Sequence, residues 1–150
     1  MSIAYNHITV VSARKPMNYF YGVPARNPTF VQRSDIMSRI DNVFNQDHHS
    51  SECKVVILSG LGGMGKTQLA TKYCYQCSNI YRFIFWIQAD NLNTIISSFR
   101  KLAINLGLDR EKIDNDEMVI QHVLSFAHEC SKWLLVFDNV DNDMAEKNLD

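Results

Sequence analysis

The sequence predicts an α/β protein in a three-layer α/β/α arrangement, with a parallel sheet between two layers of helices. Two observations carry this prediction. Short apolar runs alternate along the chain with segments whose apolar residues recur at helical spacing, as expected when each strand is followed by a covering helix. The apolar runs are continuous, which is typical of strands buried on both faces. These runs are 54–59, 82–89 and 133–138.

The first part of the chain lacks such patterns. Residues 1–28 show no clear period and carry Gly22, Pro24 and Pro28, so we expect an N-terminal arm or linker there and a domain over 29–150. Ser34 and Asp35 are a plausible cap for the first helix of that domain. Its apolar face comprises Ile36, Met37, Ile40, Val43 and Phe44.

Three further helices follow from periodicity and end signals. Residues 68–77 place apolar side chains on one helix face after the first run. Asp90 and Asn91 can cap a helix over 92–106, which Gly107 ends. The stretch from Asp114 to Glu117 resembles a capping box and predicts a last helix that continues to Cys130.

One stretch between strand and helix carries recognisable chemistry. Residues 60–67 read Gly-Leu-Gly-Gly-Met-Gly-Lys-Thr and satisfy G-x-x-x-x-G-K-[ST], the phosphate-binding loop. Bare backbone N–H groups in such a loop cradle phosphate oxygens, and the helix that follows adds the positive end of its dipole. The predicted nucleotide-binding residues are Gly60, Leu61, Gly62, Gly63, Met64, Gly65, Lys66, Thr67 and Gln68.

Individual residues of the loop have separate roles. Gly60 and Gly65 permit backbone angles that a side chain would forbid, while the other two glycines keep the loop bare. Lys66 is expected to reach the β- and γ-phosphates as a point charge. Thr67 is expected to place its hydroxyl on Mg²⁺.

A second chemical position follows the third apolar run. Residues 133–138 deliver one carboxylate, Asp138, to the C-terminal edge of the sheet, where ligands of such sheets bind. Thr67 and Asp138 are therefore the predicted metal ligands, as in the pair of Walker-A and Walker-B motifs. Asn139 stands next to Asp138 as the second candidate catalytic residue. Because an amide is a very poor base, we expect slow hydrolysis.

Composition limits the classes of function. The chain has 150 residues and a formal net charge of −1, which gives no reason to expect nucleic acid or a membrane as a partner. No apolar run is long enough to span a bilayer. Cys74 and Cys77 form a C-x-x-C, but no second ligand pair follows at zinc-site spacing and both lie on an apolar helix face. Core packing and a reduced, cytoplasmic protein are favoured.

These motifs resemble the nucleotide-binding domains of signal-transduction ATPases, the NB-ARC type of apoptotic and immune receptors. The loop matches the G-x-G-G-x-G-K-T form of that family, and residues 83–90 resemble its second-strand block. Residues 134–140 resemble its Walker-B block, where an Asp-Asp pair is more usual. Asp138-Asn139, with the tryptophan in the second strand, is closer to fungal members.

The resemblance also implies an adenine-binding segment and a missing part. Phe30-Val31-Gln32-Arg33 resembles the segment that wraps the adenine, so Val31 would contact the base and Arg33 would lie near the nucleotide. The match covers about 28–140. The sensor strand of the family, which lies between the phosphate-loop strand and the Walker-B strand, and the later helical and winged-helix subdomains have no counterpart. We therefore expect a partial P-loop NTPase domain, unless the first and third strands pair directly.

The resulting hypothesis is a domain that binds ATP or ADP with Mg²⁺ within a nucleotide-controlled oligomerisation switch. Its partners would be the adenine nucleotide and either copies of itself or related receptor chains, and it would be at most a slow ATP hydrolase. Two alternatives stay open. One is a P-loop enzyme such as a small-molecule kinase or a motor ATPase. The other is a non-catalytic interaction fragment that binds through exposed strand edges.

Overall fold

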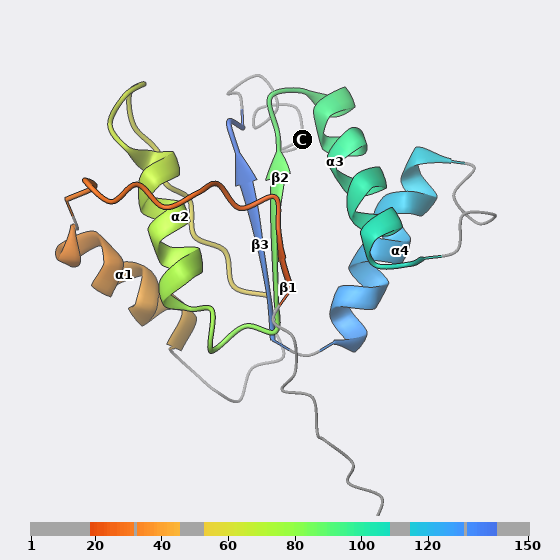
Figure 1. Cartoon of the computed structure of the whole chain (residues 1–150), viewed down its shortest axis with the longest axis horizontal. Coiled ribbons are helices and arrows are strands. Elements are labelled where there is room, and N and C mark those ends of the chain that lie inside the picture. Colours follow the sequence, from red (N-terminus) through yellow and green to blue (C-terminus); the bar gives the residue numbers. More distant parts are fainter. Residues whose placement is uncertain (1–18, 32, 46–52, 109–114, 131, 141–150) are drawn as a thin grey trace, which may run out of the picture.

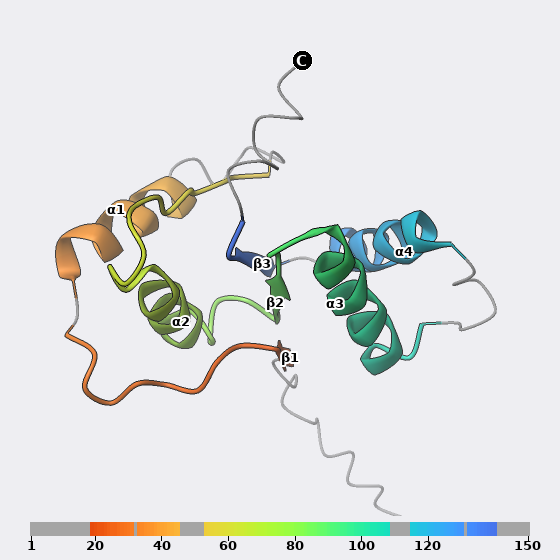
Figure 2. The ribbon, with the colours of Figure 1, turned by 90° about the horizontal axis from the view of Figure 1, so that it is seen from above.

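A three-stranded parallel sheet with helices on both faces forms the centre of the protein (Figures 1 and 2). The computed structural model describes residues 19–31, 33–45, 53–108, 115–130 and 132–140. The elements are β1 Tyr19–Tyr21, α1 Ser34–Asn45, α2 Lys66–Gln76, β2 Phe83–Gln88, α3 Leu92–Asn105, α4 Asp116–Glu129 and β3 Trp133–Asp138. The predicted three-layer α/β/α class is confirmed.

Strand β2 lies in the middle of the sheet, and both its faces are covered. Ile84 and Trp86 pack into the core beneath α1 and α2, while Phe83, Phe85 and Ile87 pack into the core beneath α3 and α4. This alternation follows from the two-residue period of a strand. All five side chains are buried, which is why the run reads as continuously apolar.

Strands β2 and β3 end together. Their parallel register sets Gln88 opposite Asp138, and the Ala89 N–H donates to the Asp138 carbonyl at 2.8 Å, one residue beyond β2. Helix α3 then begins at a capping box, in which the Asn91 side chain accepts from the Thr94 N–H at 3.1 Å. The C-terminal edge of the sheet is thus fixed by regular hydrogen bonds.

The third strand is not the one that the sequence predicts. The segment 54–59 forms no strand and has no described partner in the sheet. Val56 and Leu58 pack against the α1/α2 core, whereas the side chains of Val55 and Ile57 are 72% and 83% exposed. The predicted strand at 54–59 is therefore wrong, because a strand needs a neighbouring strand with which to form hydrogen bonds. Neither direct pairing with β3 nor burial of both faces occurs.

Strand β1 takes the free edge of β2 instead. Tyr19–Tyr21 pairs in parallel with residues 83–85, and the Tyr19 ring stacks on Phe83 with centroids 5.6 Å apart. This strand was not predicted, because residues 1–28 show no clear period and were expected to form an arm or linker. Residues 1–18 lie outside the described part, so the predicted boundary between arm and domain stays a prediction.

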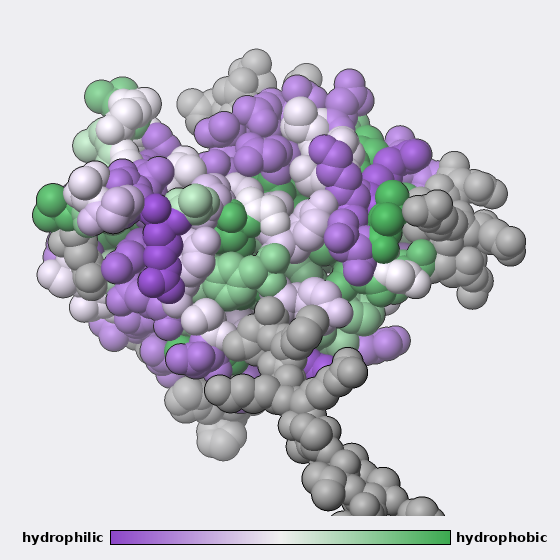
Figure 3. All heavy atoms as spheres, in the orientation of Figure 1, coloured by the Kyte–Doolittle hydropathy of each residue, from purple (hydrophilic) through white to green (hydrophobic). Residues whose placement is uncertain are grey.

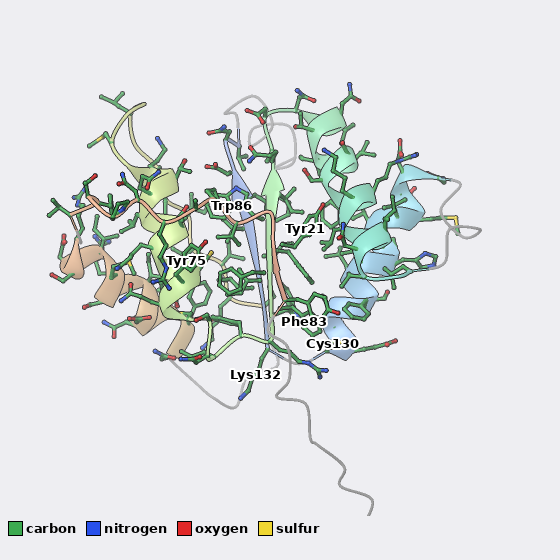
Figure 4. All side chains as sticks on the ribbon, in the orientation of Figure 1. Tyr21, Tyr75, Phe83, Trp86, Cys130 and Lys132 are labelled. Carbon is green, nitrogen blue, oxygen red and sulfur yellow. The ribbon has the colours of Figure 1, made fainter. Side chains whose placement is uncertain are left out.

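After β1 the chain crosses α2 on its way to α1 (Figures 1 and 4). Gly22 adopts φ +72° against the Trp86 backbone, and a Cβ there would meet the Trp86 carbonyl oxygen at 2.8 Å. Tyr75 makes three contacts, one with β1 and two with the crossing segment. Its hydroxyl donates to the Pro24 carbonyl at 3.2 Å, its ring contacts Phe20, and the Arg26 guanidinium lies 4.3 Å from the ring centroid.

On the side of the molecule that faces the viewer in Figure 1, hydrophobic residues lie at the centre, between helices that carry mainly hydrophilic residues (Figure 3). In the described parts of the chain, no helix has the length and apolar character needed to cross a membrane.

The N-cap of α4 differs from the prediction, whereas the two cysteines of the C-x-x-C motif are buried as predicted. The N-cap of α4 is Asn115, whose side chain accepts from the Glu117 N–H at 3.0 Å, so the expected cap at Asp114 is wrong by one residue, and Asp114 itself lies outside the described residues. Cys74 and Cys77 are buried in the α1/α2 core, as expected, and all four cysteines are free thiols. Burial raises the pKa of the Cys74 thiol to about 12.

Candidate functional site

The glycine loop runs over 60–65, from the extended segment into the N-terminus of α2. Gly60, Gly63 and Gly65 all have positive φ, which side chains disfavour. Gly65 is the N-cap of α2 in the left-handed conformation, and its carbonyl accepts the first helical hydrogen bond from the Leu69 N–H at 2.9 Å. The loop therefore stands at the positive end of the α2 dipole.

Lys66 is the first residue of α2 and turns back over the loop. Its Nζ donates to the carbonyl oxygens of Gly60 at 2.7 Å and Leu61 at 3.0 Å. An ammonium is a mobile point charge with three donors, so these carbonyls are replaceable by phosphate oxygens of higher charge. The Lys66 ammonium thus lies over the first two residues of the glycine loop.

Thr67 and Asp138 meet at the edge of the sheet. The Thr67 hydroxyl donates to Asp138 Oδ1 at 2.9 Å, although 71 residues separate them in the sequence. Helix α2 brings the hydroxyl and β3 brings the carboxylate, so the two chemical motifs form one site. Gln68 follows in the first turn of α2 and is half-buried.

These two oxygen atoms fit a magnesium ion. Mg²⁺ takes oxygen ligands, usually keeps several waters, and is commonly held by one or two protein groups together with phosphate oxygens. One hydroxyl and one carboxylate already in hydrogen-bond contact meet that requirement without a larger cluster. Among the described residues no group of three or more His, Cys, Asp and Glu could hold a metal ion.

Asn139 and Asp90 form a neighbouring polar pair that sequence reasoning missed. Asn139 Nδ2 donates to Asp90 Oδ1 at 3.2 Å, linking the ends of β3 and β2. The sequence named Asp90 and Asn91 together as the cap of α3, and Asn91 provides it. The sequence could have predicted this pair, because Asp90 and Asn139 each lie one or two residues after a predicted parallel strand, and the ends of such strands meet at one edge of the sheet.

The proposed adenine segment lies beside the loop. A Cβ at Gly65 would lie 3.4 Å from the ring of Phe30, so Phe30 borders the point where the loop becomes helix. Val31 follows with its side chain 82% exposed. Arg33 is also exposed, and its carbonyl accepts from the Met37 N–H at 3.0 Å as α1 begins. Val31 and Arg33 have no described contact with the loop residues.

Comparison with known proteins agrees with this geometry. The family model described as "NB-ARC domain" matches residues 36–149. The chain belongs to the NB-ARC domain family. This confirms the resemblance drawn from the loop and from the Walker-B block. As an NB-ARC chain, the protein is in general terms a nucleotide-binding signalling module.

One curated relative of this NB-ARC chain is a nucleotide-binding leucine-rich repeat (NLR)-like protein from the fungus Hyaloscypha variabilis. The two are 24% identical over 136 residues, which cover 86% of this chain and 14% of that protein. The chain thus spans a small part of the relative's length. No solved structure matches the chain.

Proposed function

We propose that this chain binds ATP or ADP with Mg²⁺ and forms the nucleotide-binding part of an NLR-like oligomerisation switch in the cytoplasm. The observation that carries the proposal is the hydrogen bond of 2.9 Å between Thr67 and Asp138 beside the glycine loop. It joins the phosphate-binding and metal-binding motifs, and a glycine-rich turn with an unrelated lysine would not require that contact.

The nucleotide would be held from three sides. The loop amides and Lys66 would bind the phosphates, with Thr67 and Asp138 as the Mg²⁺ ligands. Val31 and Arg33 would border the adenine, which the position of Phe30 against Gly65 supports. A bound metal ion would supply charge neutralisation at the phosphates. Asp138 and Asn139 are the candidate catalytic residues, and Asn139 favours slow hydrolysis because it is a poor base.

A lysine pair in α2 tests the binding site. Lys66→Ala should weaken ADP binding about 10- to 100-fold, because a charge-assisted hydrogen bond is worth about 1.5–3 kcal/mol. Lys72→Ala, in the same helix but outside the loop, should leave the dissociation constant within about twofold. Calorimetric titration with ADP and with ATP, each with and without Mg²⁺, measures both variants.

The outcomes separate the proposal from its rivals. Equal affinity of the Lys66→Ala variant and the wild type would mean that the loop does not bind phosphate. The switch predicts that gel filtration with ATP and with ADP gives different oligomeric states. A constant elution volume would favour an enzyme that acts as a single unit or a fragment that binds without nucleotide control.

A further inference from the structure

The Asp90–Asn139 pair stands at the same edge of the sheet as the proposed nucleotide site. Asn139 follows Asp138 directly in the chain, and Asp138 in turn contacts Thr67. Asn139 Nδ2 donates to Asp90 Oδ1 at 3.2 Å across the ends of β3 and β2. Two hydrogen bonds, joined by the peptide bond between Asp138 and Asn139, thus connect the first turn of α2, the end of β3 and the residues that follow β2.

Both members of the pair are held by their backbones. Asn139 has φ +62°, in the left-handed region that asparagine tolerates better than most residues. Asp90 stands between Ala89, whose N–H donates to the Asp138 carbonyl, and Asn91, which caps α3. The 3.2 Å contact therefore joins two side chains whose starting points are fixed, although both residues are exposed to solvent.

The contact with Asp90 determines the orientation of the Asn139 side-chain amide. An asparagine side chain donates from its nitrogen and accepts at its oxygen, and a flip about the terminal bond exchanges the two. An ionised carboxylate only accepts hydrogen bonds. Asp90 therefore selects the orientation in which Asn139 Nδ2 faces it. Asn139 Oδ1 is then directed away from Asp90 as an acceptor.

We propose that Asp90 is a positioning residue for nucleotide hydrolysis, acting through Asn139. It fixes the amide so that Oδ1 accepts a hydrogen bond from the water that attacks the terminal phosphate. This inference rests on the proposed function. A neutral side-chain amide can orient an attacking water without taking its proton, as glutamine does in several P-loop enzymes.

The reaction balances without a protein base. The water oxygen forms a bond to the terminal phosphorus, and the bond between that phosphorus and the bridging oxygen breaks. The electron pair of the broken bond leaves on the nucleoside diphosphate. One proton of the water stays on the released phosphate, and the other passes to solvent. Asn139 contributes orientation alone, which keeps the expected rate low.

A double-mutant cycle on the 150-residue chain tests the inference. Phosphate release is measured in single turnover with saturating protein for the wild type, Asp90→Ala, Asn139→Ala and the double variant. Each single change should lower the rate about tenfold, the equivalent of about 1.4 kcal/mol. The double variant should be no slower than Asn139→Ala, because Asp90 acts only through that amide. Asp116→Ala, which removes an exposed carboxylate paired with Arg100, is the matched control and should keep the wild-type rate.

Several outcomes would overturn the inference. A wild-type rate in Asp90→Ala, or a double variant about a hundredfold slower than the wild type, would show that Asp90 does not act through Asn139. If the wild type released phosphate no faster than Lys66→Ala, the inference about Asp90 would also fail. The proposed function would still hold if calorimetry showed that the wild type binds nucleotide. A wild type that binds no nucleotide would end both.

Discussion

Gly22 shows how a single residue decides where the N-terminal segment can lie. Because glycine has no side chain, the backbone at this position can pass close to β2, where a Cβ would meet the Trp86 carbonyl oxygen at 2.8 Å. The segment then reaches Tyr75 and, further on, brings Phe30 against Gly65 of the phosphate loop. A close approach at one end of the segment thus supports the position of the proposed adenine-binding residues at the other.

Gly22→Ala should therefore lower the free energy of unfolding by about 2–4 kcal/mol, because backbone strain of about 1–2 kcal/mol adds to a steric clash. Gly107→Ala is a matched control, with φ +70° but no neighbour within 4 Å of a Cβ, and should cost only the backbone strain. Urea unfolding followed by circular dichroism measures both. Equal losses would mean that the clash with Trp86 is relieved at no cost.

The extended segment 53–59 shows what an element gains from its neighbours. It enters the phosphate loop with Val56 and Leu58 on the core side and with Val55 and Ile57 exposed. Its order in the described structure comes from side-chain packing on one face, because no strand pairs with it. An unpaired extended segment leaves backbone donors and acceptors to solvent, which is the situation of a sheet edge.

Asparagine substitutions at adjacent positions should separate the two faces. Leu58→Asn should cost about 1–3 kcal/mol of stability, because it takes a polar amide into the α1/α2 core. Ile57→Asn should change stability by less than about 0.5 kcal/mol, since that side chain is 83% exposed. Thermal melts of both variants give the comparison. A large loss at Ile57 would show that this face is covered in solution, contrary to the described structure.

At the scale of the whole molecule, β2 joins two cores of different chemistry. The core beneath α3 and α4 is aliphatic and aromatic, and its ionisable groups, Tyr21 and Cys130, lie at its margin. The core beneath α1 and α2 contains Tyr73, Cys74 and Cys77, with Tyr81 packed against it. Burial raises the pKa of all four groups, so the folded state favours their neutral forms.

This composition predicts a loss of stability at alkaline pH. The unfolded chain releases these protons first, near pH 8.5 for cysteine and about 10 for tyrosine, so it binds fewer protons than the folded chain above those values. Stability is therefore full below about pH 8 and falls as pH rises towards the folded pKa of Cys74, about 12.

Urea midpoints between pH 7 and pH 10.5 measure this loss. Cys74→Ala should flatten the decline relative to its own value at pH 7, because the variant lacks one of the buried acids. A wild-type midpoint that stays constant over the range would contradict the assignment of buried, neutral thiols and phenols.

The sequence alone determined the features that rest on local pattern or on short spacing. The glycine loop, the helix faces and the carboxylate at Asp138 were visible in this way. So were the strands predicted at 82–89 and 133–138, which the structure places at 83–88 and 133–138. Such signals are local because backbone conformation and side-chain periodicity depend on neighbouring residues. The NB-ARC resemblance drew on the same motifs.

Only the tertiary structure decided which extended segments pair and which polar groups meet. Tyr19–Tyr21, rather than the apolar run at 54–59, completes the sheet, and Asp90 lies against Asn139 instead of capping α3. Strand pairing and contacts between strand ends join residues far apart in sequence. Their free energy depends on a partner that no local window contains.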